Sequence, residues 1–392
     1  MDNQQTEKTV DPVSATSVAP VSHQEIIHVS ELVLQHPIMV ECQRRIDRAL
    51  ALPAGYDILL VVGPTGAGKT TLMSTLLSSP VGGGLALPSL ARALAPGAIP
   101  VISVKAHNGK TFPSRWKALL LDILKAVNPA LFELGKLSDP QSTRLAYAGT
   151  MLEKVSIPRL LSLVTEGLRL RQTRAVLVDE SQHLAPTACA EDLRLMAESL
   201  KDLGSNAGTV LVLFGDYTLL DFLGVSAQLA RRSSPIHFRR YMVDDETDYA
   251  NFQRIVFSFS KAAPTLLPFD QLSGSLHLLY FGCLGSTGTL AQWLERAMGE
   301  AILAGSPSVT VPLLEATMLA GIQYTQMVDQ INLGEEKYAK MFSPLKSLMA
   351  SVLGTALPAA PAAPKRAHPQ LKPGQRKPTR DQTGPDEVPL AA

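Results

Sequence analysis

The sequence has little of what marks membrane, secreted or zinc-binding proteins. It contains 3 cysteines in 392 residues. They lie far apart and form no C-x-x-C pair, which indicates idle thiols of a reducing compartment rather than disulfides or a zinc site. No apolar run approaches the roughly 20 residues that span a bilayer. The stretch MDNQQTEKTVDPVSATSVAP lacks the apolar segment of a signal peptide. We therefore expect a cytoplasmic protein with no membrane partner.

The chain also lacks an excess of charge of either sign. Lys and Arg number 36, Asp and Glu number 35, and the formal net charge is +1. This balance argues against a protein that coats nucleic acid through bulk charge, although it is compatible with local basic stretches. Apolar residues make up 46% of the chain and charged residues 18%, which is a globular composition that can bury a sizeable core.

Short apolar strands alternate with helical patterns over the first part of the chain. We expect strands at 57–62, 99–104, 175–178, 209–214 and 236–238. Helices are expected between them at 70–77, 115–127, 159–170 and 189–203. This alternation predicts a three-layer α/β domain with a parallel sheet. Beyond about residue 260 only helical patterns remain, at 271–281, 287–303, 311–320 and 324–330.

These patterns divide the chain into four parts. We expect a flexible tail at 1–25, an α/β core at 26–260, a helical lid at 261–350 and a disordered tail at 351–392. The last tail carries six Lys or Arg and no acid between Lys365 and Arg380. A segment that binds DNA or a protein and a plain solubilising tail are both compatible with this composition.

The most specific motif is GPTGAGKT at 63–70, which matches G-x-x-x-x-G-K-[ST] between a predicted strand and a predicted helix. Its glycines let backbone amides converge on phosphate oxygens, and the helix N-terminus faces the same anion. Lys69 would reach the β- and γ-phosphates, and the Thr70 hydroxyl would bind Mg²⁺. The sequence thus predicts a loop for ATP and Mg²⁺ made of Gly63, Pro64, Thr65, Gly66, Ala67, Gly68, Lys69, Thr70 and Thr71.

An acidic pair follows the third predicted strand, in AVLVDE at 175–180. We expect this strand to lie beside the first one and to bring both carboxylates to the edge where α/β sheets bind ligands. Asp179 would then hold Mg²⁺ through water, and Glu180 would orient or polarise the attacking water. A pair of acids, rather than a single Asp, favours hydrolysis over simple nucleotide binding.

Asp216 follows the predicted strand at 209–214. Two interpretations are equally open for it. Its carboxylate could sense the γ-phosphate from the tip of the strand. It could also be an ordinary cap for a helix at 217–223.

Four arginines lie within ten residues in AQLARRSSPIHFRRY, with no acid among them: Arg231, Arg232, Arg239 and Arg240. A guanidinium from a neighbouring subunit stabilises the charge that spreads over the γ-phosphate oxygens during transfer. An Arg that ends the helix before the last strand is suitably placed for this role in a ring-forming ATPase, so we prefer Arg231 or Arg232. The alternative is a solvated basic turn, partly paired with the acids of Asp244–Asp248.

Together, GPTGAGKTTL, VLVDESQHL and QLARRS…FRRY resemble AAA+ ATPases, and in particular the TniB/TnsC group of transposition regulators. The resemblance covers about residues 30–305. It implies an AAA+ core with a helical lid that assembles as an ATP-dependent ring or filament around duplex DNA. It also implies that the assembly selects a target site with a targeting protein, passes the site to a transposase, and is dismantled by ATP hydrolysis. AAA+ lids often carry a nucleotide-sensing Arg after a Gly-containing turn, whereas the matching stretch Gly285–Thr289 has none.

Members of this family contact the DNA backbone through the central pore. The basic stretch KAHNGKTFPSRWK offers phosphate contacts that position DNA without reading its sequence, from Lys105, Lys110, Thr111, Arg115 and Lys117. A solvated loop is an equal alternative for this stretch. Two other functions also stay open for the chain: a motor or loader that acts on a protein, and a scaffold that binds ATP but hardly hydrolyses it.

Overall fold

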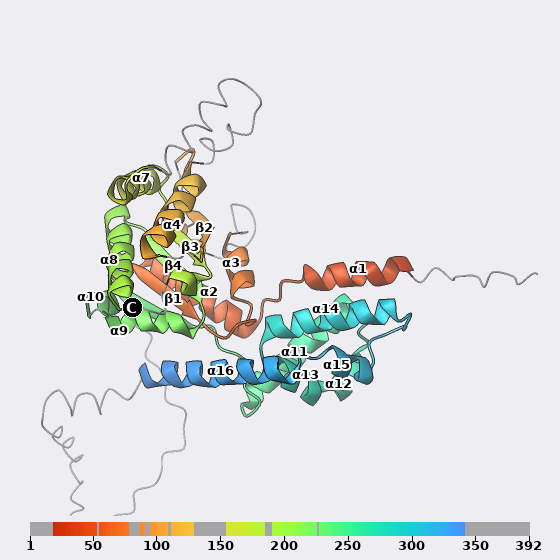
Figure 1. The fold of residues 1–392 in the computed structure, drawn as a ribbon. Helices are drawn as coiled ribbons and strands as arrows, with labels where there is room; N and C mark the ends of the chain where they lie inside the picture. The colour runs from red at the N-terminus through yellow and green to blue at the C-terminus, as the bar shows by residue number, and fades with distance from the viewer. Residues whose placement is uncertain are drawn as a thin grey trace, which may run out of the picture. The chain divides into compact units, whose positions relative to one another are not determined.

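The structure is a computed structural model that describes residues 19–52, 55–77, 87–90, 95–108, 111–128, 154–184, 190–225 and 227–341 (Figure 1). These residues belong to the first of two compact units, Met1–Met341. The second unit, Phe342–Ala392, and the expected basic tail within it lie outside the described residues.

The described residues form a five-stranded parallel sheet of order β2-β3-β4-β1-β5. Its strands are β1 (Ile58–Val62), β2 (Val101–Lys105), β3 (Ala175–Asp179), β4 (Val210–Gly215) and β5 (Ser233–His237). The prediction of an α/β fold with a parallel sheet is confirmed. The sequence placed the last strand too late because β5 contains Ser233, Ser234 and Pro235. Proline is tolerated there since β5 lies at the edge of the sheet.

One predicted relationship within the sheet is wrong. The strand that carries the acidic pair, β3, does not lie beside β1, because β4 lies between them. Strand order depends on how the crossover helices pack, and the spacing of strands along the chain does not reveal it.

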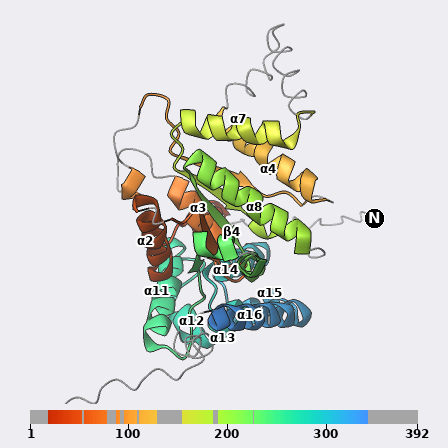
Figure 2. The same ribbon diagram turned by 90° about the vertical axis from the view of Figure 1, so that its left-hand side faces the viewer.

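Helices cover both faces of the sheet, because alternate residues of each buried strand point to opposite sides. One face packs against α4 (Phe112–Val127), α7 (Ile157–Leu170) and α8 (Ala190–Ala207), which Figure 2 shows on one side of the sheet. The other face packs against α2 (Pro37–Ala51) and α3 (Lys69–Leu77). The short helices η1 (Pro88–Leu90), η3 (Ser181–Leu184), η4 (Tyr217–Leu220), α9 (Asp221–Val225) and α10 (Ala227–Arg232) complete this part.

A second group of helices follows the sheet, as predicted. It comprises α11 (Glu246–Ala262), α12 (Phe269–Gly274), α13 (Leu276–Cys283), α14 (Thr287–Leu303), α15 (Val311–Thr317) and α16 (Gly321–Met341). Helix α11 was not predicted, and its range spans the expected border between core and lid at 260–261. Buried Trp293 anchors the group, and its indole N–H donates to the carbonyl oxygen of Leu314 at 3.1 Å.

Helix α1 (Ala19–Ser30) begins inside the segment expected to be a flexible tail. It lies along α14 in Figure 1. The Glu25 carboxylate is buried and accepts hydrogen bonds from the backbone N–H groups of Thr265 and Leu266, at 3.1 and 2.9 Å. These long-range contacts hold the segment in place, and its weak apolar periodicity gave no sign of them.

Helix α16 is longer than the predicted 324–330 and runs from the lid back toward α9 (Figure 1). Gly334 lies so close to the ring of Tyr217 that an added Cβ would stand 2.0 Å from a ring carbon. The Lys337 ammonium forms an ion pair with Asp221 at 2.6 Å. The last helix of the described residues, α16, therefore packs on the core directly after β4.

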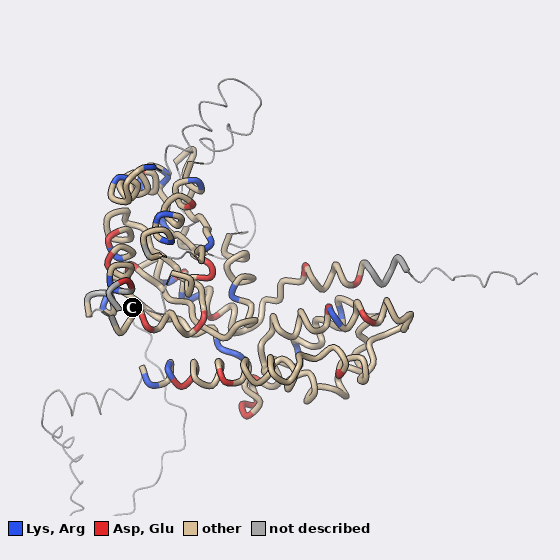
Figure 3. The backbone as a smooth tube through the Cα atoms, in the orientation of Figure 1, with Lys and Arg blue, Asp and Glu red and all other residues tan. Residues whose placement is uncertain are grey.

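The cysteines, the hydropathy of the helices and the distribution of charge can be examined over the described residues. Cys42 and Cys283 are free and buried, and burial raises the pKa of both thiols to about 12. Cys189 lies outside the described residues. None of the described helices combines the length and hydropathy of a membrane span. Basic and acidic positions are intermixed along the described helices, for example on α16 (Figure 3).

Candidate nucleotide-binding site

The Gly-rich loop lies where the sequence predicts it, between β1 and α3. Gly66 and Gly68 have φ angles of +76° and +102°, a region that side chains disfavour. At Gly63 an added Cβ would lie 2.1 Å from the carbonyl oxygen of Phe238. The glycines are thus required by backbone conformation and by close packing, and the loop leads into the N-terminus of α3.

Lys69 is half-buried against this loop. Its ammonium donates to the carbonyl oxygens of Gly63 and Pro64, at 2.9 and 2.7 Å. Burial lowers the pKa of Lys69 to about 8, and the negative charges of Asp216, Glu180 and Asp179 oppose this shift. The residues predicted to bind phosphate and magnesium therefore lie close enough to act on one another.

Thr70 and Asp179 meet although β4 lies between β1, which precedes Thr70 in the chain, and β3, which ends at Asp179. The Thr70 hydroxyl donates to the Asp179 carboxylate at 3.2 Å. A hydroxyl and a carboxylate oxygen are the hard oxygen ligands that Mg²⁺ prefers. This donor pair fits a magnesium ion bound beside the phosphates, which would neutralise part of their charge.

Glu180 has a φ of +51°, which is uncommon for a residue with a side chain and concentrates at functional sites. Its backbone N–H donates to the Asp179 carboxylate at 2.9 Å. Its own carboxylate accepts a hydrogen bond from the side-chain amide of Gln182. Within DESQHL, the sequence pattern indicates no role for Gln182, because only the fold shows which way its amide points.

Asp216 caps a helix, which was one of its two interpretations. Its carboxylate accepts from the backbone N–H and the hydroxyl of Thr218, at 2.9 and 2.5 Å, at the start of η4. Its second oxygen accepts from the side-chain amide of Gln330 on α16 at 3.4 Å. Among the acids, Asp216 also has the largest effect on the pKa of Lys69. Capping therefore does not remove it from the phosphate region.

The start of α14 contacts the Gly-rich loop directly, which the sequence did not indicate. The Thr287 hydroxyl donates to the carbonyl oxygen of Ala67, and the Thr289 backbone N–H donates to that of Gly66, both at 2.9 Å. A Cβ at Gly288 would lie 2.6 Å from the same Gly66 oxygen. The stretch Gly285–Thr289, which has no nucleotide-sensing Arg, thus packs its own backbone against the Gly-rich loop.

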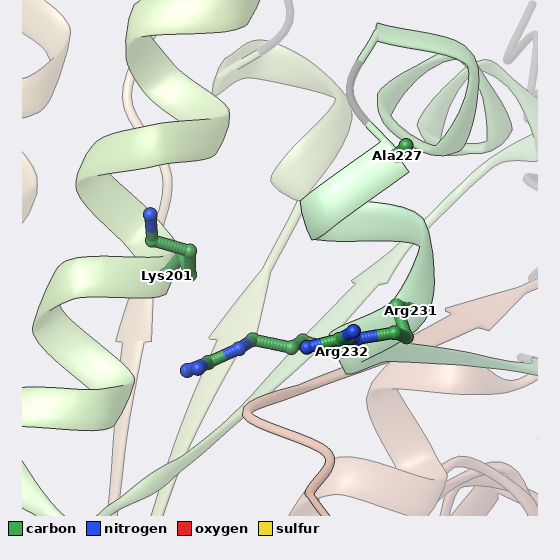
Figure 4. Close-up of a pocket in the computed structure, with 4 residues that line it drawn as sticks. All are labelled: Lys201, Ala227, Arg231 and Arg232. Atoms are coloured by element: carbon green, nitrogen blue, oxygen red, sulfur yellow. The ribbon is translucent and has the colours of Figure 1, made fainter.

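The two candidate arginine fingers have different surroundings. Arg232 is committed within its own chain, since it donates to the Asp57 carboxylate at 2.8 Å and to the Ser205 hydroxyl at 2.6 Å. Arg231 is exposed and has no hydrogen bond or ion pair among the described residues. Both line a cavity of about 490 Å³ with Lys201 and Ala227 (Figure 4).

This cavity lies at the N-terminal ends of β1 and β5, whereas the Gly-rich loop follows the C-terminal end of β1. Asp57, the partner of Arg232, precedes β1, whereas the loop follows β1. Neither arginine therefore belongs to the nucleotide site of its own chain, and a role in hydrolysis requires a neighbouring subunit.

The other two arginines of the cluster form ion pairs within the chain. Arg239 pairs with Asp248 through two hydrogen bonds, which agrees with the expected pairing to the acidic run. Arg240 pairs in the same way with Glu335 of α16, at 2.9 and 3.1 Å.

The expected DNA-contacting stretch is only partly suitable. Lys105 and Thr111 are exposed and Lys117 is half-buried. Arg115 is only 8% exposed, which contradicts its expected contact with a phosphate backbone. The first turn of α4 turns Arg115 inward, while Thr111 and Ser114 form a capping box at the helix start. Lys110 lies outside the described residues.

Residues 54–223 match the family model of an AAA domain. This span contains the Gly-rich loop, the acidic pair and Asp216. The fold is that of an AAA+ protein. The AAA+ arrangement consists of the sheet in the order β2-β3-β4-β1-β5 followed by the helical lid. The narrower likeness to TniB/TnsC regulators rests on the quoted motifs alone.

Solved structures give likenesses of low identity. A Walker-type ATPase of Pyrococcus abyssi is 16% identical, with 81% of this chain and 85% of that chain covered and a TM-score of 0.41. Drosophila ORC bound to DNA is 13% identical, with 91% of this chain and 85% of that chain covered and a TM-score of 0.47. Cdc6p from Pyrobaculum aerophilum is 16% identical, with 68% of this chain and 63% of that chain covered and a TM-score of 0.42. No curated protein matches the sequence. At these values none of the likenesses assigns an activity to this chain.

Proposed function

We propose that the protein is an ATPase that binds ATP with Mg²⁺ and hydrolyses it to ADP and phosphate. The observation that carries the proposal is the meeting of Thr70, Asp179 and Glu180 beside the Gly-rich loop that holds Lys69. Lys69 and the loop amides bind the phosphates, and Thr70 and Asp179 hold the metal ion. Glu180 orients the attacking water.

Two variants test this assignment. Lys69→Ala is expected to lose ATP binding, because it removes the cation from the phosphate site. Glu180→Gln is expected to bind ATP normally but to hydrolyse it on the order of a hundredfold more slowly, since an amide is a poor proton acceptor. Nucleotide binding and phosphate release would be measured on both. Normal hydrolysis by Glu180→Gln would remove Glu180 from the mechanism.

We further propose that subunits assemble as a ring or filament in which Arg231 reaches the nucleotide of the next subunit. Arg231 is exposed and unpaired among the described residues, and it lies away from its own Gly-rich loop. Arg232 was an equal candidate from sequence, but its ion pair with Asp57 gives it a structural role. Asp216 keeps the proposed role of sensing the γ-phosphate from the tip of β4.

The proposed substrate of this assembly is duplex DNA, and the proposed biological role is the selection of transposition targets. The motifs shared with TniB/TnsC regulators support this role, which includes a targeting protein and a transposase as partners. The exposed Lys105, with Thr111 and Lys117, supplies backbone contacts that repetition around a ring would multiply. Nearly neutral subunits would then bind DNA through repetition rather than net charge.

Electron microscopy with duplex DNA and a non-hydrolysable ATP analogue tests the DNA proposal. Rings or filaments threaded by DNA are expected. The variant Lys105→Glu, Lys117→Glu is expected to weaken binding and to flatten its dependence on salt, whereas Lys261→Glu, an exposed change on α11, serves as the control. Assemblies that form without DNA and bind none at low salt would favour a motor that acts on protein instead.

A further inference from the structure

We propose that Gln182 is a positioning residue that holds the Glu180 carboxylate for hydrolysis; this inference rests on the proposed ATPase function. Gln182 lies in η3, two residues after Glu180. Its Nε2 atom donates a hydrogen bond to Oε2 of Glu180. One carboxylate oxygen is thereby occupied, and the other can accept a hydrogen bond from the attacking water.

The restraint acts on a residue with an unusual backbone. Glu180 has a φ of +51°, and its N–H is turned back to the Asp179 carboxylate at 2.9 Å. This geometry places adjacent acidic side chains in different roles, one toward Thr70 and one toward Gln182. Without the amide of Gln182, the same Oε2 atom of Glu180 would keep, of the neighbours that the structure describes, only the more distant His183 Nε2 at 3.8 Å.

The other end of the Gln182 amide carries a cost in stability. Its Oε1 atom is buried and has no hydrogen-bond partner among the described residues. It lies against Gly215, where an added Cβ would stand 2.6 Å from it. A buried carbonyl without a donor costs free energy that an apolar side chain of the same size would avoid.

The orientation of the amide follows from the charge of Glu180. Rotation of the amide by half a turn would bring Oε1 against the Glu180 carboxylate, where two negative oxygens repel one another. The ionised Glu180 therefore selects the donor, and the acceptor is left facing Gly215 at the tip of β4. The two side chains form a unit that links the end of β3 to the end of β4.

The experiment compares two variants of nearly unchanged length that lack the N–H donor, Gln182→Met and Gln182→Glu. For both, kcat for ATP hydrolysis is expected to fall on the order of tenfold, with ATP affinity unchanged. For Gln182→Met the melting temperature is expected to equal or exceed that of the parent. Gln253→Leu, an exposed change on α11, is the control and should leave kcat and ATP affinity as they are.

The outcomes separate the inference from the function on which it rests. If the parent hydrolyses ATP and Glu180→Gln does not, but both Gln182 variants keep the parental kcat, the positioning role is overturned. A lower melting temperature of Gln182→Met with unchanged kcat would identify a purely structural glutamine. If the parent itself does not hydrolyse ATP, the proposed function fails and the positioning role falls with it. One folded Gln182 variant is sufficient for the comparison.

Discussion

The Arg240 guanidinium donates two hydrogen bonds to the Glu335 carboxylate, 2.9 and 3.1 Å long, and so joins the end of β5 to α16. Both side chains are largely buried, with exposures of 14% and 21%. Arg240 also donates to the carbonyl oxygen of Leu284, before α14, at 3.4 Å. One residue thus contacts the helical lid at two places, between α13 and α14 and on α16.

Replacement of Arg240 by Ala is expected to lower the free energy of unfolding by about 2–3 kcal/mol, because Glu335 would remain partly buried without its partner. Urea denaturation measures the effect. Arg231→Ala removes an exposed arginine at the other end of β5 and should change stability by less than about 0.5 kcal/mol. Equal stability of the two variants would show that the Arg240–Glu335 pair does not hold α16 on the core.

ATP affinity is expected to fall as the pH rises above 8. The pKa of Lys69 is lowered from 10.5 to about 8, so half of the free protein has lost this cation near pH 8, and nearly all of it has at about one pH unit above. Phosphate binding must then restore the proton, which weakens ATP binding about tenfold between about pH 7 and about pH 9. Calorimetric titration measures both affinity and proton uptake. Lys69→Arg keeps its charge, and a similar pH dependence in that variant would contradict the assignment to Lys69.

Gly288→Ala is expected to weaken ATP binding on the order of tenfold. The new Cβ would lie 2.6 Å from the backbone oxygen of Gly66, so either the Gly-rich loop or the start of α14 must move. Gly299→Ala on the same helix meets no atom within 4 Å and should instead stabilise the protein by about 0.5–1 kcal/mol. Nucleotide titration and thermal unfolding of both variants test this contrast, which an unaltered ATP affinity of Gly288→Ala would refute.

Arg231→Ala is expected to abolish hydrolysis while ATP binding stays intact. Equal mixtures of Arg231→Ala and Lys69→Ala subunits should recover about a quarter of the parental rate, because some intact nucleotide sites then face an intact Arg231. Mixtures of Arg231→Ala subunits with subunits that carry both Arg231→Ala and Lys69→Ala should recover none of the rate. Phosphate release measures hydrolysis by Arg231→Ala alone and by each of the two mixtures. No gain in the first mixture would argue against a finger supplied by the neighbouring subunit.

The sequence predicted the parts of the site that depend on local structure. GPTGAGKT lies between a strand and a helix, and Asp179 and Glu180 stand at a strand end, because each pattern contains its own periodicity and turn residues. Arg115 was misplaced for a related reason. Its basic neighbours suggested exposure, but the helical rotation of α4 turns its side chain toward the core.

Relationships between distant segments could not be read in the same way. That β4 lies between β1 and β3 depends on the packing of crossover helices. The contact of Thr289 with Gly66 depends on how the lid meets the loop. Composition contains no signal for either, since ordinary threonines and glycines make these contacts.

The return of α16 has a consequence for the order of events during synthesis. Asp216 and Asp221 meet their partners Gln330 and Lys337 across 114 and 116 residues of chain. At roughly 5–20 residues per second, the ribosome needs about 6 to 23 s to make that interval. The strand tip at Asp216 therefore leaves the ribosome long before its last contact exists. A nascent chain can form the sheet and the Gly-rich loop early, but the nucleotide site acquires its final neighbours only when the lid is complete.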